Sequence, residues 1–102
     1  MPARVALRPE AARDVAQICD WYDEQRESLG ERFLSTVDHS VENLAQHPEM
    51  CQVVFDNVRR LVMTEFPYNV YYEYERGVVT IYGVFHSARD SAVWRARLSD
   101  VR

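Results

Sequence analysis

The chain has 102 residues, of which 47% are hydrophobic and 27% are charged, and its formal net charge is −4. This size and composition predict a single globular domain over residues 1–102. The chain contains no apolar run of about 18 residues that would span a membrane, and residues 1–9 lack the apolar segment of a signal peptide. We therefore expect a cytoplasmic protein without a membrane span.

The charges are unevenly distributed along the chain. Residues 10–49 contain ten acidic residues and three arginines, whereas residues 76–102 contain five arginines and two acidic residues. All twelve basic residues are arginine, and the planar guanidinium fork suits carboxylate and phosphate groups. The C-terminal third is therefore a candidate surface for an anionic partner, although a GC-rich genome that encodes arginine by default explains the bias equally well. The net negative charge argues against indiscriminate nucleic-acid binding.

The N-terminal residues predict a short strand followed by a helix. Residues 3–7 alternate weakly between apolar and polar, as in a strand. Pro9 and Glu10 are favourable in the first turn of a helix. Apolar residues then repeat at helical spacing as far as about Gln25. This stripe is Ala12, Val15, Ile18, Cys19 and Tyr22.

A second helix follows after a short link. Ser28 and Glu31 have the spacing of a capping box, which predicts the start of the helix. Its apolar stripe is Leu29, Phe33, Val37, Val41 and Leu44. His47 and Pro48 end it, because the residue before a proline disfavours helical backbone. Two helices joined by so short a link are expected to form an antiparallel hairpin with a shared apolar seam.

The period changes to that of strands after Pro48. Residues 52–55, 58–64, 70–75 and 78–86 are extended runs, and Arg76-Gly77 is the turn between the last two. Gly83 interrupts the alternation of the last run and predicts a bulge. Residues 91–98 predict a short final helix with Asp90 or Ser91 as its N-cap. This order predicts an α+β fold: an N-terminal strand, a helical hairpin on a three- to four-stranded, mainly antiparallel sheet, and a C-terminal helix.

The cysteines and histidines indicate neither a disulfide nor a metal site. Cys19 and Cys51 are expected to be free thiols, because disulfides are rare in a reducing compartment. The histidines have no metal-ligand spacing with each other or with the cysteines; they are His39, His47 and His86. We expect no metal and no cofactor.

Two blocks of this sequence resemble one known family. Residues 58–72 read VRRLVMTEFPYNVYY and resemble the Arg, Phe-Pro-Tyr, aliphatic-Tyr-Tyr signature of the ParE/RelE toxin superfamily, also called plasmid stabilisation proteins. Residues 84–97 read VFHSARDSAVWRAR and resemble its closing motif of His, Arg-Asp, Trp and Arg, except that members commonly carry proline where Ser91 stands. The hairpin with Phe33 and the Leu-x-x-His-Pro exit at residues 44–48 also fits, so the resemblance covers nearly the whole chain.

The resemblance implies the toxin of a bacterial type II toxin–antitoxin system, neutralised by a cognate antitoxin in a hetero-oligomer. ParE-like members inhibit DNA gyrase and are not enzymes, whereas RelE-like members enter the ribosome and cleave mRNA. Fold alone does not distinguish these two targets, so the distinction has to come from the site residues. We favour gyrase inhibition. The alternatives are a RelE-like mRNA endonuclease and a degenerate relative that only binds the antitoxin.

The nuclease alternative has four candidate catalytic residues. His86 is a candidate acid or base, and Arg59, Arg60 and Arg89 are candidates to stabilise the phosphate. Nucleolytic relatives often have a lysine-rich surface and a tyrosine near the C-terminus. This chain has no lysine, and it has no tyrosine after Tyr82, which argues against the nuclease alternative. Structural roles compete: His86 can bond the following loop to Asp90, and either Arg59 or Arg60 can pair with a glutamate on a neighbouring strand, namely Glu65, Glu73 or Glu75.

Six residues are candidates for partner contacts. Asp23 and Glu27 lie on the acidic outer side of the hairpin and favour an antitoxin segment with basic residues. Tyr71 and Tyr82 are the tyrosines expected to be exposed, whereas Tyr72 and Tyr74 are expected to pack under the hairpin. Trp94 and Arg97 complete the set, although a tryptophan at this position is more often part of the core.

Overall fold

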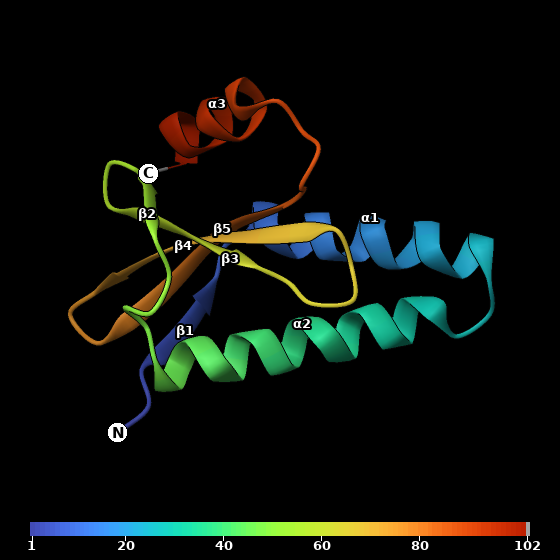
Figure 1. Ribbon diagram of the computed structural model, residues 1–102, viewed down its shortest axis with the longest axis horizontal. Helices are drawn as coiled ribbons and strands as arrows, with labels where there is room; N and C mark the ends of the chain where they lie inside the picture. Colours follow the sequence, from blue (N-terminus) through green and yellow to red (C-terminus); the bar gives the residue numbers. More distant parts are fainter. Residues whose placement is uncertain (102) are drawn as a thin grey trace.

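A five-stranded mixed sheet separates the helices into two layers (Figure 1). The computed structural model describes residues 1–101. The strands are β1 (Arg4–Leu7), β2 (Val53–Phe55), β3 (Val58–Val62), β4 (Tyr68–Glu75) and β5 (Val78–His86), in the spatial order β1-β5-β4-β3-β2. β1 runs parallel to β5, and the other neighbours are antiparallel. The α+β prediction is confirmed, with a larger sheet than expected because the short run before β3 pairs with it as β2.

The helical hairpin covers one face of the sheet. It consists of α1 (Pro9–Gln25) and α2 (Leu29–Gln46), close to the predicted limits. Its core side contributes Phe33, Val37 and Leu44 as predicted, but Ala11 is fully buried where Ala12 was expected. Ala11, Val15 and Ile18 are spaced by four and three residues, which keeps them on one helix face. Tyr72 and Tyr74 pack in this core, as predicted.

The capping box predicted at the start of α2 is wrong. Ser28 has a left-handed backbone with φ of 69° and its side chain caps nothing. Instead, Asp23 reaches across from α1, and its Oδ1 accepts the Gly30 N–H at 2.8 Å. A Cβ at Gly30 would lie 2.6 Å from the same oxygen, so this close approach requires glycine. A tertiary contact therefore replaces the local cap.

The other face of the sheet is covered by α3 (Ser91–Val101), which continues beyond the predicted end. Asp90 Oδ1 accepts the Ala92 N–H at 2.8 Å, which confirms Asp90 as the N-cap. Trp94 stacks on Tyr71 with ring centroids 4.8 Å apart. The second core consists of Val58, Tyr71, Tyr82, Phe85, Trp94 and Leu98. The prediction that Tyr71 and Tyr82 are exposed is wrong, because alternation along a strand assigns side chains to faces but does not reveal that α3 covers the face opposite to the hairpin.

The bulge in β5 is confirmed. Tyr71 faces Gly83 and Tyr72 faces Ile81, so Tyr82 is the additional residue. The turn between β4 and β5 uses positive φ at both central residues, 53° at Arg76 and 79° at Gly77, which matches the twist of a tight hairpin.

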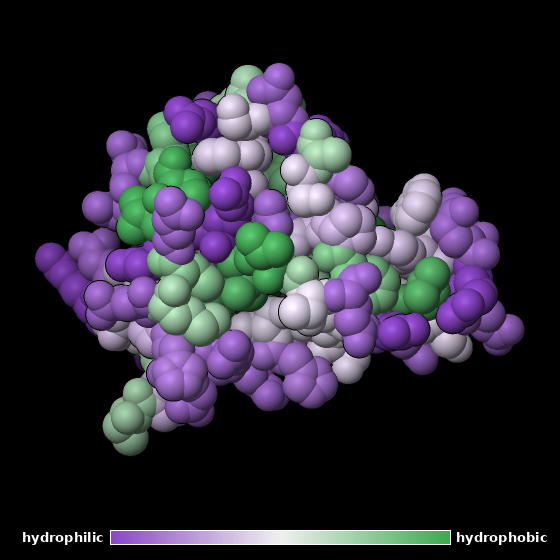
Figure 2. Space-filling view, viewed as in Figure 1, coloured by the Kyte–Doolittle hydropathy of each residue, from purple (hydrophilic) through white to green (hydrophobic). Residues whose placement is uncertain are grey.

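The surface is mixed, with polar side chains bordering apolar ones over β2 and β3 (Figure 2). The exposed apolar residues of that region include Met50, Val53 and Val62. Both cysteines are free. None of the described helices is both long and apolar enough to cross a membrane.

Candidate functional site

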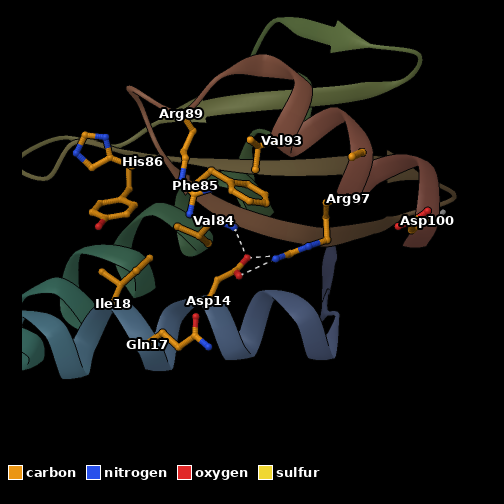
Figure 3. A pocket seen from close by; sticks show the side chains of 12 residues that line it. Asp14, Gln17, Ile18, Val84, Phe85, His86, Arg89, Val93, Arg97 and Asp100 are labelled. Carbon is orange, nitrogen blue, oxygen red and sulfur yellow. Dashed lines mark hydrogen bonds and ion pairs between the residues drawn. The ribbon is translucent and has the colours of Figure 1, made fainter.

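A polar groove with a volume of about 480 Å³ lies between α1, α3 and the C-terminal half of β5. Figure 3 shows Asp14 and Gln17 of α1 on one wall and Val93, Arg97 and Asp100 of α3 on the other. β5 and the loop after it supply the floor and one end, with Val84, Phe85, His86 and Arg89. The groove thus joins three segments that are far apart in the sequence.

An ion pair between Asp14 and Arg97 crosses the centre of the groove. Arg97 Nη1 donates to Asp14 Oδ2 at 2.9 Å and Arg97 Nη2 donates to Asp14 Oδ1 at 3.0 Å, which is the two-pronged geometry of a strong pair. The hydrogen bond to Asp14 raises the pKa of Arg97, although burial opposes this. The Arg97 guanidinium also lies 4.8 Å from the centre of the Phe85 ring. The pair fixes α3 against α1.

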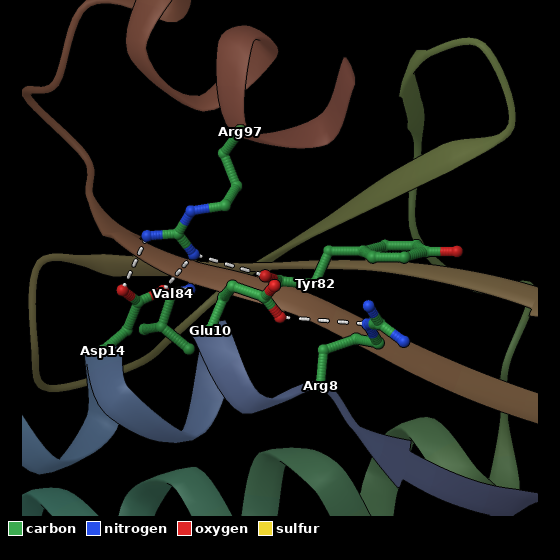
Figure 4. A network of polar contacts seen from close by, with 6 residues as sticks. All are labelled: Arg8, Glu10, Asp14, Tyr82, Val84 and Arg97. Atoms are coloured by element: carbon green, nitrogen blue, oxygen red, sulfur yellow. Dashed lines mark hydrogen bonds and ion pairs between the residues drawn. The ribbon is translucent and has the colours of Figure 1, made fainter. Parts of the chain in front are cut away.

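The same pair covers a strand edge. β1 pairs with β5 only as far as Ile81, so no strand of the described residues 1–101 neighbours the outer edge of β5 beyond that point. Asp14 Oδ2 accepts the Val84 N–H at 3.0 Å, and Arg97 Nη1 donates to the Tyr82 carbonyl at 3.4 Å (Figure 4). Two side chains therefore take the place of a strand, which protects the edge from pairing with another chain.

Gly83 permits this arrangement. A Cβ at this position would lie 2.8 Å from Phe85 Cε2, 3.1 Å from Arg97 Nη1 and 3.3 Å from Asp14 Oδ2. The bulge thus brings the Gly83 backbone so close to the ion pair that a Cβ would force the Phe85 ring and the pair to shift.

His86 and Arg89 lie together at one end of the groove (Figure 3). His86 Nδ1 accepts the Ala88 N–H at 3.0 Å, and the Arg89 N–H donates to the His86 carbonyl at 2.9 Å. His86 thus orders the loop as expected for a structural histidine, but through Ala88 instead of Asp90. The ring of Tyr68 lies edge-on to His86 with 5.2 Å between centroids, and burial raises the Tyr68 pKa although Arg89 opposes it.

Arg59 and Arg60 do not line this groove. Arg59 Nη1 donates to the carbonyls of Glu49 at 3.0 Å and Cys51 at 2.7 Å, and Nη2 lies 4.0 Å from Glu49 Oε2. Arg60 faces Tyr71 across the strand pair and so lies on the α3 side, opposite to Arg59. One of these two arginines was expected to pair with Glu65, Glu73 or Glu75. Arg59 instead donates to carbonyls of the loop before β2, which folds back over it.

The six partner-contact candidates are divided between the surface and the core. Asp23 and Glu27 are exposed at the turn of the hairpin, where they line a shallow depression with Ser28 and Glu31. Tyr71, Tyr82 and Trp94 are buried, and the Tyr82 hydroxyl donates to Glu73 Oε1 at 2.7 Å. Arg97 is held by Asp14.

Asp14 is the functional-site residue that sequence reasoning missed. In the sequence it falls on the acidic side of the first helix and resembles the solvent-exposed carboxylates around it. Its partners Val84 and Arg97 are 70 and 83 residues away in the sequence, so no local spacing signals its role. The bulge at Gly83 was the indirect signal, because it marks a close backbone approach.

Comparison with known proteins assigns the family. Residues 5–91 match the family described as ParE toxin of type II toxin-antitoxin system, parDE. A search of curated proteins finds no significant match. Two solved structures are similar to this chain. One is a chain of the chromosomal ParDE system from P. aeruginosa, with 18% identity and a TM-score of 0.71; the match covers 82% of this chain and 95% of that chain. The other is a chain of the RelBE2 toxin-antitoxin complex from Mycobacterium tuberculosis, with 15% identity and a TM-score of 0.61; the match covers 84% of this chain and 99% of that chain. At these identities the structures show a shared fold. With the family match over most of its length, the chain belongs to the ParE toxin family of type II toxin–antitoxin systems.

Proposed function

We propose that this toxin acts by binding its target, as an inhibitor of DNA gyrase, and that a cognate antitoxin neutralises it in a hetero-oligomer. The observation that carries this proposal is the separation of the candidate nuclease residues. His86 and Arg89 line the groove between α1 and α3, whereas Arg59 and Arg60 do not line it and lie on opposite faces of the sheet.

Cleavage of RNA at the ribose 2′-hydroxyl needs a base, a proton donor and cations around one phosphorus atom. In this protein Arg59 is engaged with two backbone carbonyls and is a structural residue. Asp14 and Asp100 place carboxylates in the groove, which is unfavourable for a phosphodiester backbone. The arrangement therefore supports recognition of a protein surface more than phosphoryl chemistry.

The exposed end of the groove offers groups suited to such recognition. His86 and Arg89 are exposed, and no hydrogen bond or ion pair within residues 1–101 involves the Arg89 guanidinium. Val93 adds an apolar side chain that is 37% exposed. Arginine beside exposed apolar surface is typical of protein interfaces. We place the target contact at this end.

The acidic turn of the hairpin supports the antitoxin part of the proposal. The carboxylates of Asp23, Glu27 and Glu31 gather there, and such a cluster increases the rate of encounter with a basic segment. Asp23 also holds the start of α2 through Gly30, so Glu27 is the better residue to test. Glu27→Lys should slow association with the antitoxin at low salt. An unchanged association rate would show that the turn does not contact the antitoxin.

Since gyrase and ribosomes are both cytoplasmic, the proposal places the protein in the cytoplasm.

The decisive experiment compares two assays with the same purified toxin. Supercoiling by gyrase should stop on addition of toxin and recover on addition of the antitoxin encoded beside it, whereas toeprinting of translated mRNA should show no new cleavage. Codon-specific cleavage with intact supercoiling would establish the nuclease alternative. Inactivity in both assays with retained antitoxin binding would establish the degenerate relative.

Two substitutions sharpen this comparison. His86→Gln keeps a hydrogen-bonding side chain but removes the acid–base group, so a binding toxin should retain most of its activity in the supercoiling assay. Arg89→Ala should weaken inhibition by about tenfold or more, the loss typical of one arginine hot spot. Arg13→Ala, an exposed arginine on α1 outside the groove, serves as the matched control and should leave inhibition unchanged.

A further inference from the structure

The backbone of β3 has an unpaired position at Val62. On the outer side of β3, the Arg60 N–H donates to the Gln52 carbonyl at 3.1 Å. Every second residue of an antiparallel strand directs its backbone groups to the same side, so the N–H and C=O of Val62 also point outward. The pairing of β2 with β3 involves only Val58 and Arg59 and ends before Val62. No backbone hydrogen bond among the described residues takes up these two outward groups.

The side chain of Val62 is uncovered as well. It is 66% exposed, and its neighbours along the chain are Leu61 and Met63, so this stretch of the edge carries neither charge nor proline. Sheet edges in natural proteins usually carry charges or proline, or are covered by another segment. The edge of β5 is covered in this way by the Asp14–Arg97 pair. The edge of β3 at Val62 is open to another strand.

A polar groove lies beside this edge, between β3 and α2. Its volume is about 330 Å³. The α2 wall consists of polar side chains, namely Thr36, His39, Ser40 and Asn43. Glu65 at the end of the groove is paired with Arg32, whose Nε lies 3.3 Å from Glu65 Oε2. A strand added beside Val62 would therefore not meet an uncompensated carboxylate or guanidinium in this groove.

A second copy of the chain fits this edge by symmetry. Antiparallel pairing around a two-fold axis at Val62 lets the Val62 N–H of each copy donate to the Val62 carbonyl of the other, which satisfies both outward groups. The same axis places Leu61 of one copy opposite Met63 of the other. All of these residues are apolar, so no like charges face one another. The edge is self-complementary in hydrogen bonding and in side-chain character.

The acidic turn of the hairpin does not oppose this arrangement. The Arg32–Glu65 pair holds the start of α2 near the C-terminal end of β3, so the turn lies at that end. Antiparallel pairing directs the C-terminal ends of the two β3 strands away from each other. The carboxylates that line the turn, Asp23, Glu27 and Glu31, would thus lie at opposite ends of the pair of molecules.

We propose that the chain associates with a second copy of itself through the free edge of β3, in antiparallel pairing around Val62. Standard interfaces involve about 20–30 residues of each partner, whereas this contact centres on residues 61–63. The dimer is therefore weak, and its population depends on protein concentration. The contact is separate from the groove at His86 and does not depend on the target of the toxin.

Sedimentation and NMR of the isotope-labelled whole protein test the proposal over about a hundredfold range of concentration. As the concentration rises, the sedimenting mass should increase toward that of a dimer. The amide signal of Val62 should shift, and its hydrogen exchange should slow. A protein that stays monomeric over the whole range, or signal shifts that map to α3 and not to β3, would overturn the proposal.

Charged side chains at position 62 test the two-fold pairing itself. Val62→Lys and Val62→Glu each place like charges opposite one another across the axis, so association should weaken by about tenfold or more in either variant. An equimolar mixture of the two variants should associate again, because lysine then faces glutamate. Val93→Lys, at an exposed valine of α3, is the matched control and should associate like the wild-type protein.

Both variants at position 62 should fold, because substitutions at exposed sites usually change stability little, and thermal unfolding checks this. Association that persists in Val62→Lys would place the contact elsewhere on the molecule. A mixture of the two charged variants that stays monomeric would show that Val62 does not face its own counterpart. Either result would contradict the proposed pairing.

Discussion

Arg97 in the final helix and Asp14 in the first helix form a two-pronged ion pair across 83 residues of sequence. The side chain of Asp14 is 12% exposed and that of Arg97 is 24% exposed, so solvent screens the pair only partly. Because Asp14 also accepts the Val84 N–H, the pair connects both helical layers to β5. It is the centre of the polar network in Figure 4.

Replacing Asp14 should destabilise the protein substantially. Asp14→Ala leaves the Arg97 guanidinium and the Val84 N–H without their acceptor in a partly buried site, and we expect a loss of about 2–4 kcal/mol in the free energy of unfolding. Asp20→Ala on the exposed side of α1 is the control and should change stability by less than about 0.5 kcal/mol. Urea denaturation measures both. Equal effects of the two substitutions would show that the pair contributes little.

The two glycines of β5 and its turn should respond differently to substitution. Gly83→Ala forces a Cβ against Phe85, Arg97 and Asp14, and we expect a loss of about 1–3 kcal/mol. Gly77 has open space around it but a φ of +79°, so Gly77→Asn should be nearly neutral, since asparagine tolerates this backbone. Thermal unfolding of both variants tests this contrast, and a neutral Gly83→Ala would show that the groove can widen.

The two adjacent arginines of β3 should differ in their structural contribution. Arg59→Ala removes hydrogen bonds to the carbonyls of Glu49 and Cys51, and we expect a loss of about 1–2 kcal/mol. The nearby Glu49 carboxylate is 72% exposed and adds little. Arg60→Ala is the matched control, because no hydrogen bond or ion pair of residues 1–101 involves its guanidinium. Proteolysis of the loop before β2 should increase only in Arg59→Ala; an increase in neither variant would contradict the assignment.

Trp94 should be the main apolar anchor of α3. Its side chain is 5% exposed and stacks on Tyr71, so Trp94→Ala should cost about 3–5 kcal/mol. That is a large part of the stability of a small domain, and Trp94→Phe provides a milder variant that still folds. Val93→Ala, at an exposed neighbouring position, should be close to neutral. Chemical denaturation measures these differences, and similar values for residues 93 and 94 would argue that α3 is not held through this core.

Stability should decrease at alkaline pH. Burial raises the pKa values of Tyr22, Tyr68 and Tyr72, whereas tyrosines of the unfolded chain ionise near pH 10. Above about pH 10 the folded state binds more protons than the unfolded state, so the contribution of these groups is complete below that pH and is lost as the pH rises through the folded pKa values.

Tyr72→Phe should reduce this alkaline dependence. It should also lower stability at neutral pH by about 1 kcal/mol, because the Tyr72 hydroxyl donates to the Pro48 carbonyl. Denaturation curves at about pH 8, 9, 10 and 11, a series that brackets the ordinary pKa of tyrosine, provide the measurement. The same pH slope in both proteins would contradict the role assigned to the buried phenol.

The helical hairpin and the antiparallel strands were predictable from the sequence because their signals are local. The spacing of Phe33, Val37 and Leu44 directs one face of α2 to the core, and Gly77 permits the turn between β4 and β5. Gly83 likewise predicted a bulge in the last strand, and β5 contains one. The two motif blocks were sufficient to identify the family, which the match over residues 5–91 confirms.

Only the tertiary structure decided which side chains meet. The pairing of Asp14 with Arg97, the cap that Asp23 gives α2, and the burial of Tyr71 beneath Trp94 each join segments that chain periodicity treats independently. Periodicity assigns a residue to a face of its own element, but the partner of that face depends on how the elements pack. The proposed function depends on the separation of Arg59 and Arg60 from His86. For the same reason, this separation could be seen only in the folded protein, in which the hairpin covers one face of the sheet and α3 covers the other.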